Sequence, residues 1–201
     1  VLVVGDVNST LACSIVAKKG GKPVAHVEAG LRSNDIYMPE EINRIVTDSL
    51  TDFFFVTERN GVENLHREGK PDEAIHFVGH VMIDNLFFEA EKLKQAAPDP
   101  SVEALKSRFP RYGVVTLHRP SNVDDKSVLS GIVEALNTLS DDLPLIFPVH
   151  PRTRAKIAEF GLQTAENFVL TPPMGYRGFL ALWKDAAVVL TDSGGLQEET
   201  T

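Results

Sequence analysis

Short apolar runs alternate with amphipathic stretches along the whole chain. The apolar runs are continuous rather than alternating, as expected for strands of a parallel sheet that helices cover on both faces. The amphipathic stretches between them predict the connecting helices, so the expected fold class is α/β. The predicted strands are residues 1–5, 23–28, 52–57, 75–79, 112–118, 144–150, 167–171 and 187–192. The predicted helices are residues 9–19, 39–50, 58–69, 81–96, 101–108, 125–140, 152–160 and 176–185, and one more starts near residue 195.

The sheet order is expected to break near the segment FVGHVMIDN, so we place a domain boundary at about residue 79. Residues 1–79 and residues 80–201 then form two doubly wound, Rossmann-like units that face a cleft, and the helix at 81–96 belongs to the second unit. In such sheets a ligand binds outside the carboxyl ends of the strands. The strand ends are therefore the expected place for a site.

The composition is that of an ordinary globular protein, with 201 residues of which 43% are hydrophobic and 24% are charged. The formal net charge of −8 argues against a nucleic-acid partner, but it leaves room for a small anionic ligand that needs only a few local cations. No apolar run approaches the roughly 18 residues of a membrane span, so we expect no membrane partner.

Cys13 is the only cysteine, so no internal disulfide can form, and a reducing, cytoplasmic location is expected. We expect Cys13 to pack as a small apolar residue on a helix. The chain opens at Val1 inside a predicted strand and stops where a helix should begin, which predicts a fragment of a longer protein.

Polar side chains follow most of the predicted strands. A single histidine at a strand end is most often structural, but four of the six histidines lie there, on the edge where ligands bind. We therefore expect a site along this edge. The strand-end residues are Asp6, His26, Glu28, Thr57, His80, His118, Arg119, His150 and Asp192 to Gly195.

The segment TDSGGLQEE at residues 191–199 runs from a strand through Ser-Gly-Gly into a helix. Glycines let a ligand approach the backbone, and a helix N-terminus offers unpaired N–H groups to an anion. A plain strand-to-helix turn with Ser193 as the N-cap explains the segment equally well. Neither a G-x-G-x-x-G motif nor a Walker loop is present, so a nicotinamide cofactor or ATP is unsupported, and we expect no cofactor and no metal.

The segment TLHRPSNVDD at residues 116–125 places His118 and Arg119 beside a proline that ends the strand. His118 can transfer a proton near neutral pH, and Arg119 suits a phosphate, although a polar loop with an incidental histidine is the alternative. Asn122 or Asp124 is expected to cap the next helix. In the segment PVHPRTR, His150 stands beside two arginines, and solvated charges at a helix start explain them as well.

The segment MPEEINR at residues 38–44 opens a helix. Glu40 and Glu41 complement the helix dipole in the first turn, which is a common arrangement with no functional meaning. Arg44 lies four residues after Glu40 on the same helix face, which favours a surface ion pair between them.

Taken in order, seven segments resemble the motifs of the non-hydrolysing, bacterial and archaeal UDP-N-acetylglucosamine 2-epimerases, and the resemblance covers essentially the whole chain. The segments are GDVNSTLA, HVEAGLRS, MPEEINR, VGHVMIDN, TLHRPSNVD, PVHPRT and LTDSGGLQEE. The resemblance implies a two-domain, glycosyltransferase-B-like fold with UDP in the cleft between the domains. Residues 1–79 would be the C-terminal part of the N-terminal domain, and residues 80–201 the UDP-binding domain without its C-terminal helices. It also implies a homodimer of the full-length protein.

The same resemblance implies roles for individual residues. The catalytic groups would be three carboxylates and a histidine, namely Asp6, Glu28, Glu40 and His118. The substrate-binding residues would be Arg44 after the acid pair, Met174 and Phe179 near the uracil, Ser193, Gly194 and Gly195 at the diphosphate, and Glu199 at the ribose hydroxyls. Arg119 and His150 are similar to positions that some bacterial members use for a second, regulatory UDP-sugar. His26 is expected to be structural.

The implied reaction inverts C2 of UDP-N-acetylglucosamine and gives UDP-N-acetylmannosamine, a precursor of cell-surface polysaccharides. The C2–H bond is not beside a carbonyl group, so direct removal of this proton is very hard. Loss of UDP first leaves positive character at C1 and makes the C2 hydrogen acidic. A carboxylate then removes it, and protonation from the other face and return of UDP complete the inversion. Which carboxylate serves which face stays open.

Three alternatives stay open as well. A hydrolysing 2-epimerase would release N-acetylmannosamine and UDP. A glycosyltransferase of the same architecture would need an acceptor but no trio of acids around the sugar, and a non-catalytic fragment would only bind nucleotide. We expect the 201-residue chain itself to be much less active than its parent, or inactive, because the family's phosphate-binding segment would lie before Val1.

Overall fold

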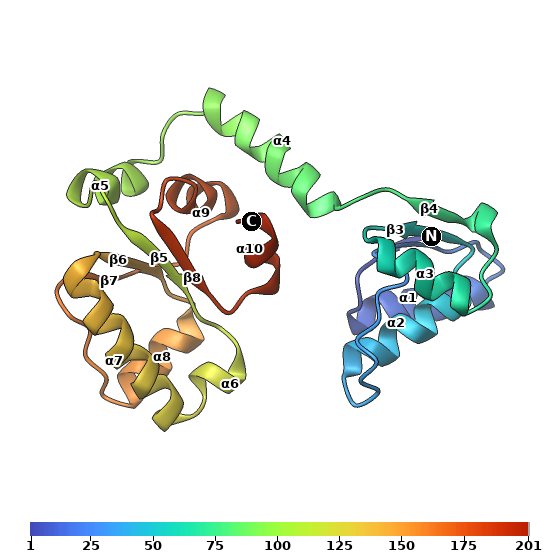
Figure 1. Ribbon diagram of the computed structural model, residues 1–201, viewed down its shortest axis with the longest axis horizontal. Coiled ribbons are helices and arrows are strands. Elements are labelled where there is room, and N and C mark those ends of the chain that lie inside the picture. Colours follow the sequence, from blue (N-terminus) through green and yellow to red (C-terminus); the bar gives the residue numbers. More distant parts are fainter. Residues whose placement is uncertain (201) are drawn as a thin grey trace. The chain divides into compact units, whose positions relative to one another are not determined.

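The computed structural model describes residues 1–200, which divide into two compact units (Figure 1). The first unit is Val1–Val81 and the second begins at Met82, so the division lies within the segment FVGHVMIDN. Each unit has its own parallel sheet of four strands and its own apolar core. The predicted fold class, α/β with parallel sheets, is confirmed.

The first unit contains β1 (Leu2–Val4), β2 (Ala25–Val27), β3 (Phe53–Val56) and β4 (Ile75–Phe77), paired in that order. Its connecting elements are α1 (Asn8–Lys19), α2 (Pro39–Leu50), α3 (Arg59–Arg67) and the 3-10 turn η1 (Asp72–Ala74). Each strand is parallel to its neighbour, so the carboxyl ends lie along one edge of the sheet. Asp6 and Glu28 follow the adjacent strands β1 and β2 at this edge.

The second unit contains β5 (Gly113–Thr116), β6 (Leu145–Pro148), β7 (Phe168–Thr171) and β8 (Val188–Thr191), in the order β7-β6-β5-β8. The chain moves from β5 outward to β6 and β7, and it then returns to the other side of β5 as β8. Such a reversal of strand order leaves a crevice outside the carboxyl ends of the two strands that flank it. The expected ligand position is therefore beside the ends of β5 and β8.

The helices of the second unit cover both faces of its sheet (Figure 1). They are α4 (Val81–Gln95), α5 (Pro100–Arg108), α6 (Pro120–Val123), α7 (Lys126–Asp142), α8 (Pro151–Glu159), α9 (Tyr176–Trp183) and α10 (Gly194–Glu199). Val114 belongs to the apolar cluster that includes Leu180 and Leu182 of α9, whereas its neighbour Val115 belongs to the cluster that includes Leu129 of α7. This arrangement explains why the apolar runs are continuous, because successive strand residues enter two different apolar clusters.

The helices differ from the sequence-based prediction in three details. The short elements η1 and α6 were not expected, because neither is long enough to show a helical period. The helix after residue 125 is capped by Asp125, whose carboxylate accepts a hydrogen bond from the N–H of Val128 at 3.0 Å, and not by Asn122 or Asp124. Cys13 lies on α1 as expected, but its side chain is exposed rather than packed.

Over residues 1–200, no helix is long and apolar enough to cross a membrane.

Gly30 provides a test of how closely the first unit is packed. Its φ is +80°, and a Cβ at this position would lie 2.4 Å from the carbonyl oxygen of Gly61 and 2.9 Å from Cγ of Leu65. The variant Gly30→Ala should therefore lower the free energy of unfolding of the first unit by about 3 kcal/mol, combining overpacking with backbone strain. Chemical denaturation followed by circular dichroism measures this loss.

Gly69 is the matched control for that variant. Its φ of +76° is nearly the same, but no atom lies within 4 Å of the position that a Cβ would take. Gly69→Ala should cost only the backbone strain, about 1 kcal/mol. Equal losses for the two variants would show that the contact between Gly30 and Gly61 does not limit the packing.

Candidate functional site

The carboxyl edge of the first sheet carries a small polar cavity. It has a volume of about 420 Å³ and is lined by Asp6, Asn8, Glu40 and Asn43, together with Val7, Ser9 and Pro39. Asp6 follows β1, and Glu40 is in the first turn of α2. Two of the three carboxylates that the resemblance makes catalytic therefore line one cavity, although 34 residues separate them in the sequence.

Glu28 follows the neighbouring strand β2 and has an unusual backbone conformation. Its φ of 70° is in the left-handed region, which a residue with a side chain seldom adopts, and its N–H donates to the carbonyl oxygen of Phe55 at 3.0 Å. Such strain costs of order 1–3 kcal/mol and tends to occur at functional positions. A Cβ on Gly5 would lie 3.6 Å from Oε2 of Glu28, so this carboxylate passes beside the residue before Asp6.

Arg44 of α2 joins two carboxylates, but Glu40 is not one of them. Its Nη1 lies 2.6 Å from Oδ2 of Asp6, and its Nη2 lies 2.8 Å from Oε2 of Glu41. The guanidinium side chain is only 12% exposed. The expected surface pair between Arg44 and Glu40 is therefore wrong, because Arg44 points inward toward the end of β1 and leaves Glu40 in the cavity.

Glu41 is a structural carboxylate, although it stands next to Glu40. Its side chain is 2% exposed, and its oxygens accept hydrogen bonds from the N–H groups of Ser33 and Asn34, each at 2.9 Å. Burial alone would raise the pKa of Glu41, but the hydrogen bonds from Ser33, Arg44 and Asn34 outweigh it and lower the pKa to about 2. Glu41 therefore does more than complement the helix dipole, because it anchors the loop that leads into α2.

A fully buried pair of hydrogen-bonded side chains, His26 and Asp48, lies behind this edge of the sheet. Nδ1 of His26 is 2.7 Å from Oδ1 of Asp48, and Nε2 of His26 is 2.9 Å from the carbonyl oxygen of Gly5. The ring thus bridges the carboxylate of Asp48 and the backbone at Gly5. The other oxygen of Asp48 accepts from the N–H of Gly30 at 3.0 Å and from Nη2 of Arg32 at 2.8 Å. His26 therefore holds the backbone next to Asp6 and does not line the cavity.

Burial would raise the pKa of Asp48, but hydrogen bonding to His26 and the charges of His26 and Arg32 outweigh that effect and lower it. The carboxylate is therefore ionised in the folded protein at neutral pH. A charge buried in this way is tolerated only when every oxygen is paired, as it is here.

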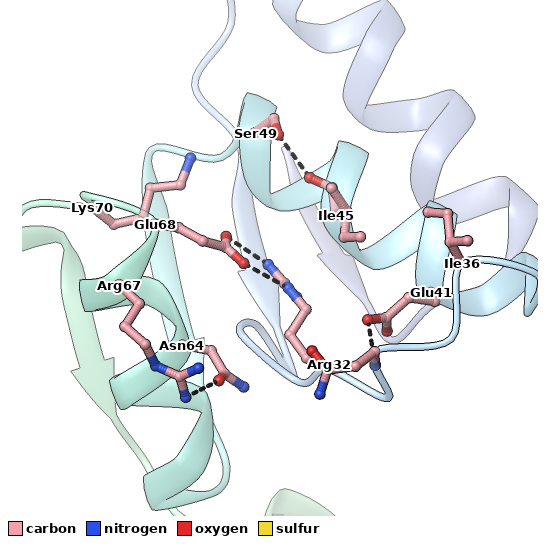
Figure 2. Close-up of a pocket in the computed structure, with 10 residues that line it drawn as sticks. Arg32, Ile36, Glu41, Ile45, Ser49, Asn64, Arg67, Glu68 and Lys70 are labelled. Carbon is pink, nitrogen blue, oxygen red and sulfur yellow. Dashed lines mark hydrogen bonds and ion pairs between the residues drawn. The ribbon is translucent and has the colours of Figure 1, made fainter.

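A second cavity of about 590 Å³ lies beside Arg32 and contains none of the site residues predicted from the sequence. In Figure 2 the guanidinium of Arg32 points to Glu68, and Arg67 points to Asn64. Lys70 donates to the carbonyl oxygen of Asp48 at 2.8 Å. Protein acceptors thus already engage the cations of this cavity, so its charges brace the fold.

In the second unit, the ends of β5 and β8 are joined by Asp192. Its carboxylate accepts hydrogen bonds from the N–H groups of His118 and Arg119, both at 2.9 Å, and from Nδ2 of Asn122 at 3.0 Å. Nδ1 of His118 lies 2.7 Å from Oδ1 of the same carboxylate. Burial would raise the pKa of Asp192, but these hydrogen bonds outweigh it and lower the pKa. The only signal for this role in the sequence is an aspartate directly before Ser-Gly-Gly.

The Ser-Gly-Gly turn follows Asp192 at the reversal of strand order. The hydroxyl of Ser193 accepts a hydrogen bond from the N–H of Leu196 at 3.4 Å, so Ser193 caps α10 as expected. No atom lies within 4 Å of the position of a Cβ on Gly194, whereas a Cβ on Gly195 would lie 2.9 Å from Cε of Met82. The turn thus leaves open space at Gly194, where a ligand can approach the backbone.

The remaining predicted residues lie around α9. Tyr176 donates a hydrogen bond from its hydroxyl to Oε1 of Glu199 at 3.0 Å. Burial, followed by the hydrogen bond to Glu199, raises the pKa of Tyr176 to about 12. Met174 lines a cavity of about 750 Å³ together with Tyr176, and both Met174 and Phe179 pack at the edge of the apolar cluster under α9.

The two positions expected for a regulatory nucleotide-sugar lie at the ends of β5 and β6. Arg119 precedes α6, and His150 caps α8 by accepting the N–H of Arg152 on Nδ1 at 3.2 Å. Both side chains are exposed. The adjacent strands β5 and β6 place them on the same edge of the sheet as His118.

This fold is found in solved structures of nucleotide-sugar epimerases. The crystal structure of Methanocaldococcus jannaschii UDP-GlcNAc 2-epimerase in complex with UDP-GlcNAc and UDP matches with a TM-score of 0.81 at 40% identity, over 98% of this chain and 56% of that chain. A co-structure of MnaA from S. aureus with UDP matches with a TM-score of 0.82 at 31% identity, over 98% of this chain and 53% of that chain.

The family model described as UDP-N-acetylglucosamine 2-epimerase matches residues 1–201, and the chain belongs to this family. A relative named UDP-N-acetylglucosamine 2-epimerase, from Methanococcus maripaludis, is 42% identical over an alignment of 208 positions that covers 99% of this chain and 56% of the relative. A relative from Pseudomonas aeruginosa, named UDP-2,3-diacetamido-2,3-dideoxy-D-glucuronate 2-epimerase, is 43% identical over an alignment of 202 positions that covers 99% of this chain and 54% of that protein. The chain thus spans about half the length of the curated relatives it matches.

Glu41 makes the stability of the first unit depend on pH. Its folded pKa of about 2 lies below the ordinary value of 4.5, so its stabilisation is present above pH 4.5 and is lost as the pH falls from 4.5 to 2. Glu41→Gln should lower the free energy of unfolding at neutral pH and flatten its dependence on pH over that range. Denaturant unfolding at a series of pH values measures both effects.

Glu40→Gln is the control, because Glu40 is in the same helix turn but is exposed. It should leave the stability and its pH dependence as they are in the unmodified chain. If the free energy of unfolding depended on pH in the same way in both variants and in the unmodified chain, a buried, ionised Glu41 would be excluded.

Proposed function

We propose that the protein epimerises UDP-N-acetylglucosamine at C2, giving UDP-N-acetylmannosamine by elimination and return of UDP. The observation that carries the proposal is the shared cavity of Asp6 and Glu40, in a chain that belongs to the 2-epimerase family. Two carboxylates at one cavity supply what the inversion of a C–H centre requires, namely proton transfer at two faces of one carbon. In this proposal the enzyme is a cytoplasmic homodimer that supplies precursors of cell-surface polysaccharides.

The first unit acts on the sugar ring. The C1–O bond breaks with both electrons leaving on UDP, and a carboxylate takes the C2 proton to give 2-acetamidoglucal. A second carboxylate protonates C2 from the opposite face, and the oxygen of UDP then bonds to C1 again. Glu28, Glu40 and Asp6 are the groups for these transfers, and Arg44 fixes the position of Asp6 through their 2.6 Å contact.

The second unit holds the nucleotide. Gly194 and Gly195 present backbone N–H groups, and Ser193 its hydroxyl, to the diphosphate at the reversal of strand order, where such ligands bind. Glu199 accepts hydrogen bonds from the ribose hydroxyls, while Phe179 and Met174 lie beside the uracil. His118 donates a proton to the departing diphosphate. Arg119 and His150 would bind a second, regulatory UDP-sugar.

The Pseudomonas aeruginosa relative suggests a second candidate substrate. Its identity of 43% is as high as that of the Methanococcus maripaludis relative, and its name specifies a diacetamido uronate instead of N-acetylglucosamine. The chemistry at C2 is the same, so the carboxylates do not separate the two substrates. Comparison of kcat/KM for the two UDP-sugars decides between them.

Deuterium incorporation tests the reaction directly. The protein, in the longest form that its reading frame encodes, is incubated with UDP-N-acetylglucosamine in heavy water. The product should be UDP-N-acetylmannosamine with deuterium at C2, because the C2 hydrogen passes through a carboxylate that exchanges with solvent. Glu28→Gln and Glu40→Gln should each slow the exchange by about 10²–10⁴-fold, since an amide cannot act as the base.

Glu41→Gln is the matched control in this assay, because Glu41 braces a loop and does not line the cavity. Under conditions where it stays folded, it should exchange much faster than Glu40→Gln. Epimer without deuterium at C2 would exclude the proposed route. Free N-acetylmannosamine as the main product would indicate a hydrolysing enzyme, and product only in the presence of an acceptor would indicate a glycosyltransferase.

The open space at Gly194 tests where the diphosphate binds. Gly194→Val should leave the melting temperature unchanged, because a Cβ there meets no atom within 4 Å. It should nevertheless weaken UDP binding by at least about 10-fold, since a side chain now stands where the phosphate approaches the backbone. Isothermal titration calorimetry with UDP measures the affinity.

Gly131→Val on the exposed face of α7 is the control, because a Cβ there also meets no atom within 4 Å. This variant should bind UDP as well as the unmodified protein does. Unchanged UDP affinity in Gly194→Val would move the diphosphate site away from this turn.

A further inference from the structure

We propose that Asp192 is a positioning residue that fixes the proton-bearing nitrogens of His118. The proposal rests on the proposed function, in which His118 donates a proton to the departing UDP. Oδ1 of Asp192 lies 2.7 Å from Nδ1 of His118, at the carboxyl ends of β8 and β5. An ionised carboxylate only accepts hydrogen bonds, so Nδ1 of His118 carries a proton in either charge state of the ring. The nitrogen that gives and takes a proton is therefore Nε2.

The exposure of the two side chains agrees with these separate roles of Nδ1 and Nε2. The side chain of Asp192 is 7% exposed and that of His118 is 54% exposed. The carboxylate is thus on the protein side of the ring, and most of the imidazole faces outward. A histidine in this arrangement can transfer protons with a ligand through one nitrogen, while the other nitrogen keeps the ring in one orientation.

The carboxylate itself has no freedom to rotate. Oδ2 accepts hydrogen bonds from the N–H groups of His118 and Arg119, each at 2.9 Å, and from Nδ2 of Asn122 at 3.0 Å. These bonds fix the direction of Oδ1, and Oδ1 fixes the ring. Asp192 also directly precedes Ser193, so one residue links the turn proposed for the diphosphate to the group proposed to protonate it.

In the reaction, the proton on Nε2 passes to a diphosphate oxygen as the C1–O bond breaks. The ring is then neutral and keeps its proton on Nδ1, toward Asp192. When UDP returns to C1, the proton passes back from the diphosphate to Nε2. Asp192 holds Nδ1 and the ring in one orientation throughout, at 2.7 Å, without itself accepting a proton.

Asp192→Asn separates this role from that of a simple brace. The amide oxygen can take the place of Oδ2 and keep the hydrogen bonds from His118, Arg119 and Asn122. The amide nitrogen then takes the place of Oδ1, and it is a donor. It therefore needs a lone pair on Nδ1, which moves the proton of the neutral ring to Nε2.

The test measures the tautomer first. Nitrogen-15 NMR of histidine-labelled protein, with the signals of His118 assigned by their loss in His118→Gln, should show the Nδ1–H tautomer in the neutral ring. Asp192→Asn should show the Nε2–H form. Asn122→Ala, which removes a neighbouring hydrogen bond but no acceptor of the ring proton, should keep the Nδ1–H form. An unchanged tautomer in Asp192→Asn would overturn the proposal.

Kinetics on the full-length form then tests the consequence. Asp192→Asn should lower kcat by about 10²-fold or more and change the affinity for UDP by less than about threefold. In the background of His118→Gln, Asp192→Asn should cause almost no further loss, because its effect acts through that ring. Additive losses, or an equal loss of kcat in Asn122→Ala, would reduce Asp192 to a brace. The tautomer does not depend on turnover, so a switch of tautomer in a protein that epimerises nothing would refute the proposed function and not the positioning.

Discussion

A buried carboxylate behind the strand ends holds the loops of each unit in place. In the first unit Asp48 binds His26, the N–H of Gly30 and Arg32, and in the second unit Asp192 binds the segment that starts at His118. A buried charge is stable only when its oxygens are fully paired, so each carboxylate forces several backbone segments into one arrangement. The glycines and acids at the strand ends depend on that arrangement for their positions.

The carboxylates of the first unit therefore divide into two groups. Successive residues of a helix point about 100° apart, so Glu40 can face the cavity of Asp6 while Glu41 faces the loop at Ser33 and Asn34. Glu41 and Asp48 do not line this cavity, and their lowered pKa values suit them to fixed hydrogen bonds. The proposed proton transfers use Asp6 and Glu40 at the cavity and Glu28, which reaches this edge of the sheet with a left-handed backbone.

The pattern of apolar runs predicted each of the strands in residues 1–200, because a parallel sheet buried on both faces leaves a strong signal. It predicted the long helices to within a few residues and missed α6, which is too short to show a period. The partners of charged side chains were predicted less well. The pairing of Arg44 with Glu40 follows from helix spacing, but the structure pairs Arg44 with Asp6, which is distant in the sequence. The position of Asp192 at a strand end was predicted, but its bonds to the segment at His118 were not, and no local pattern predicts the contacts of Asp48, because both sets of partners are distant in the sequence.

The central claim is that UDP leaves C1 and returns while the loops of the second unit hold it. Positional isotope exchange tests this most directly. UDP-N-acetylglucosamine is prepared with oxygen-18 in the bridge between C1 and the β-phosphorus, and phosphorus NMR follows the label during turnover of the full-length protein. Our account predicts that the label moves into the non-bridging oxygens of the β-phosphate while the epimer forms, because the freed phosphate can rotate before the C1–O bond is made again. Epimer in which all of the label stays in the bridge would contradict it.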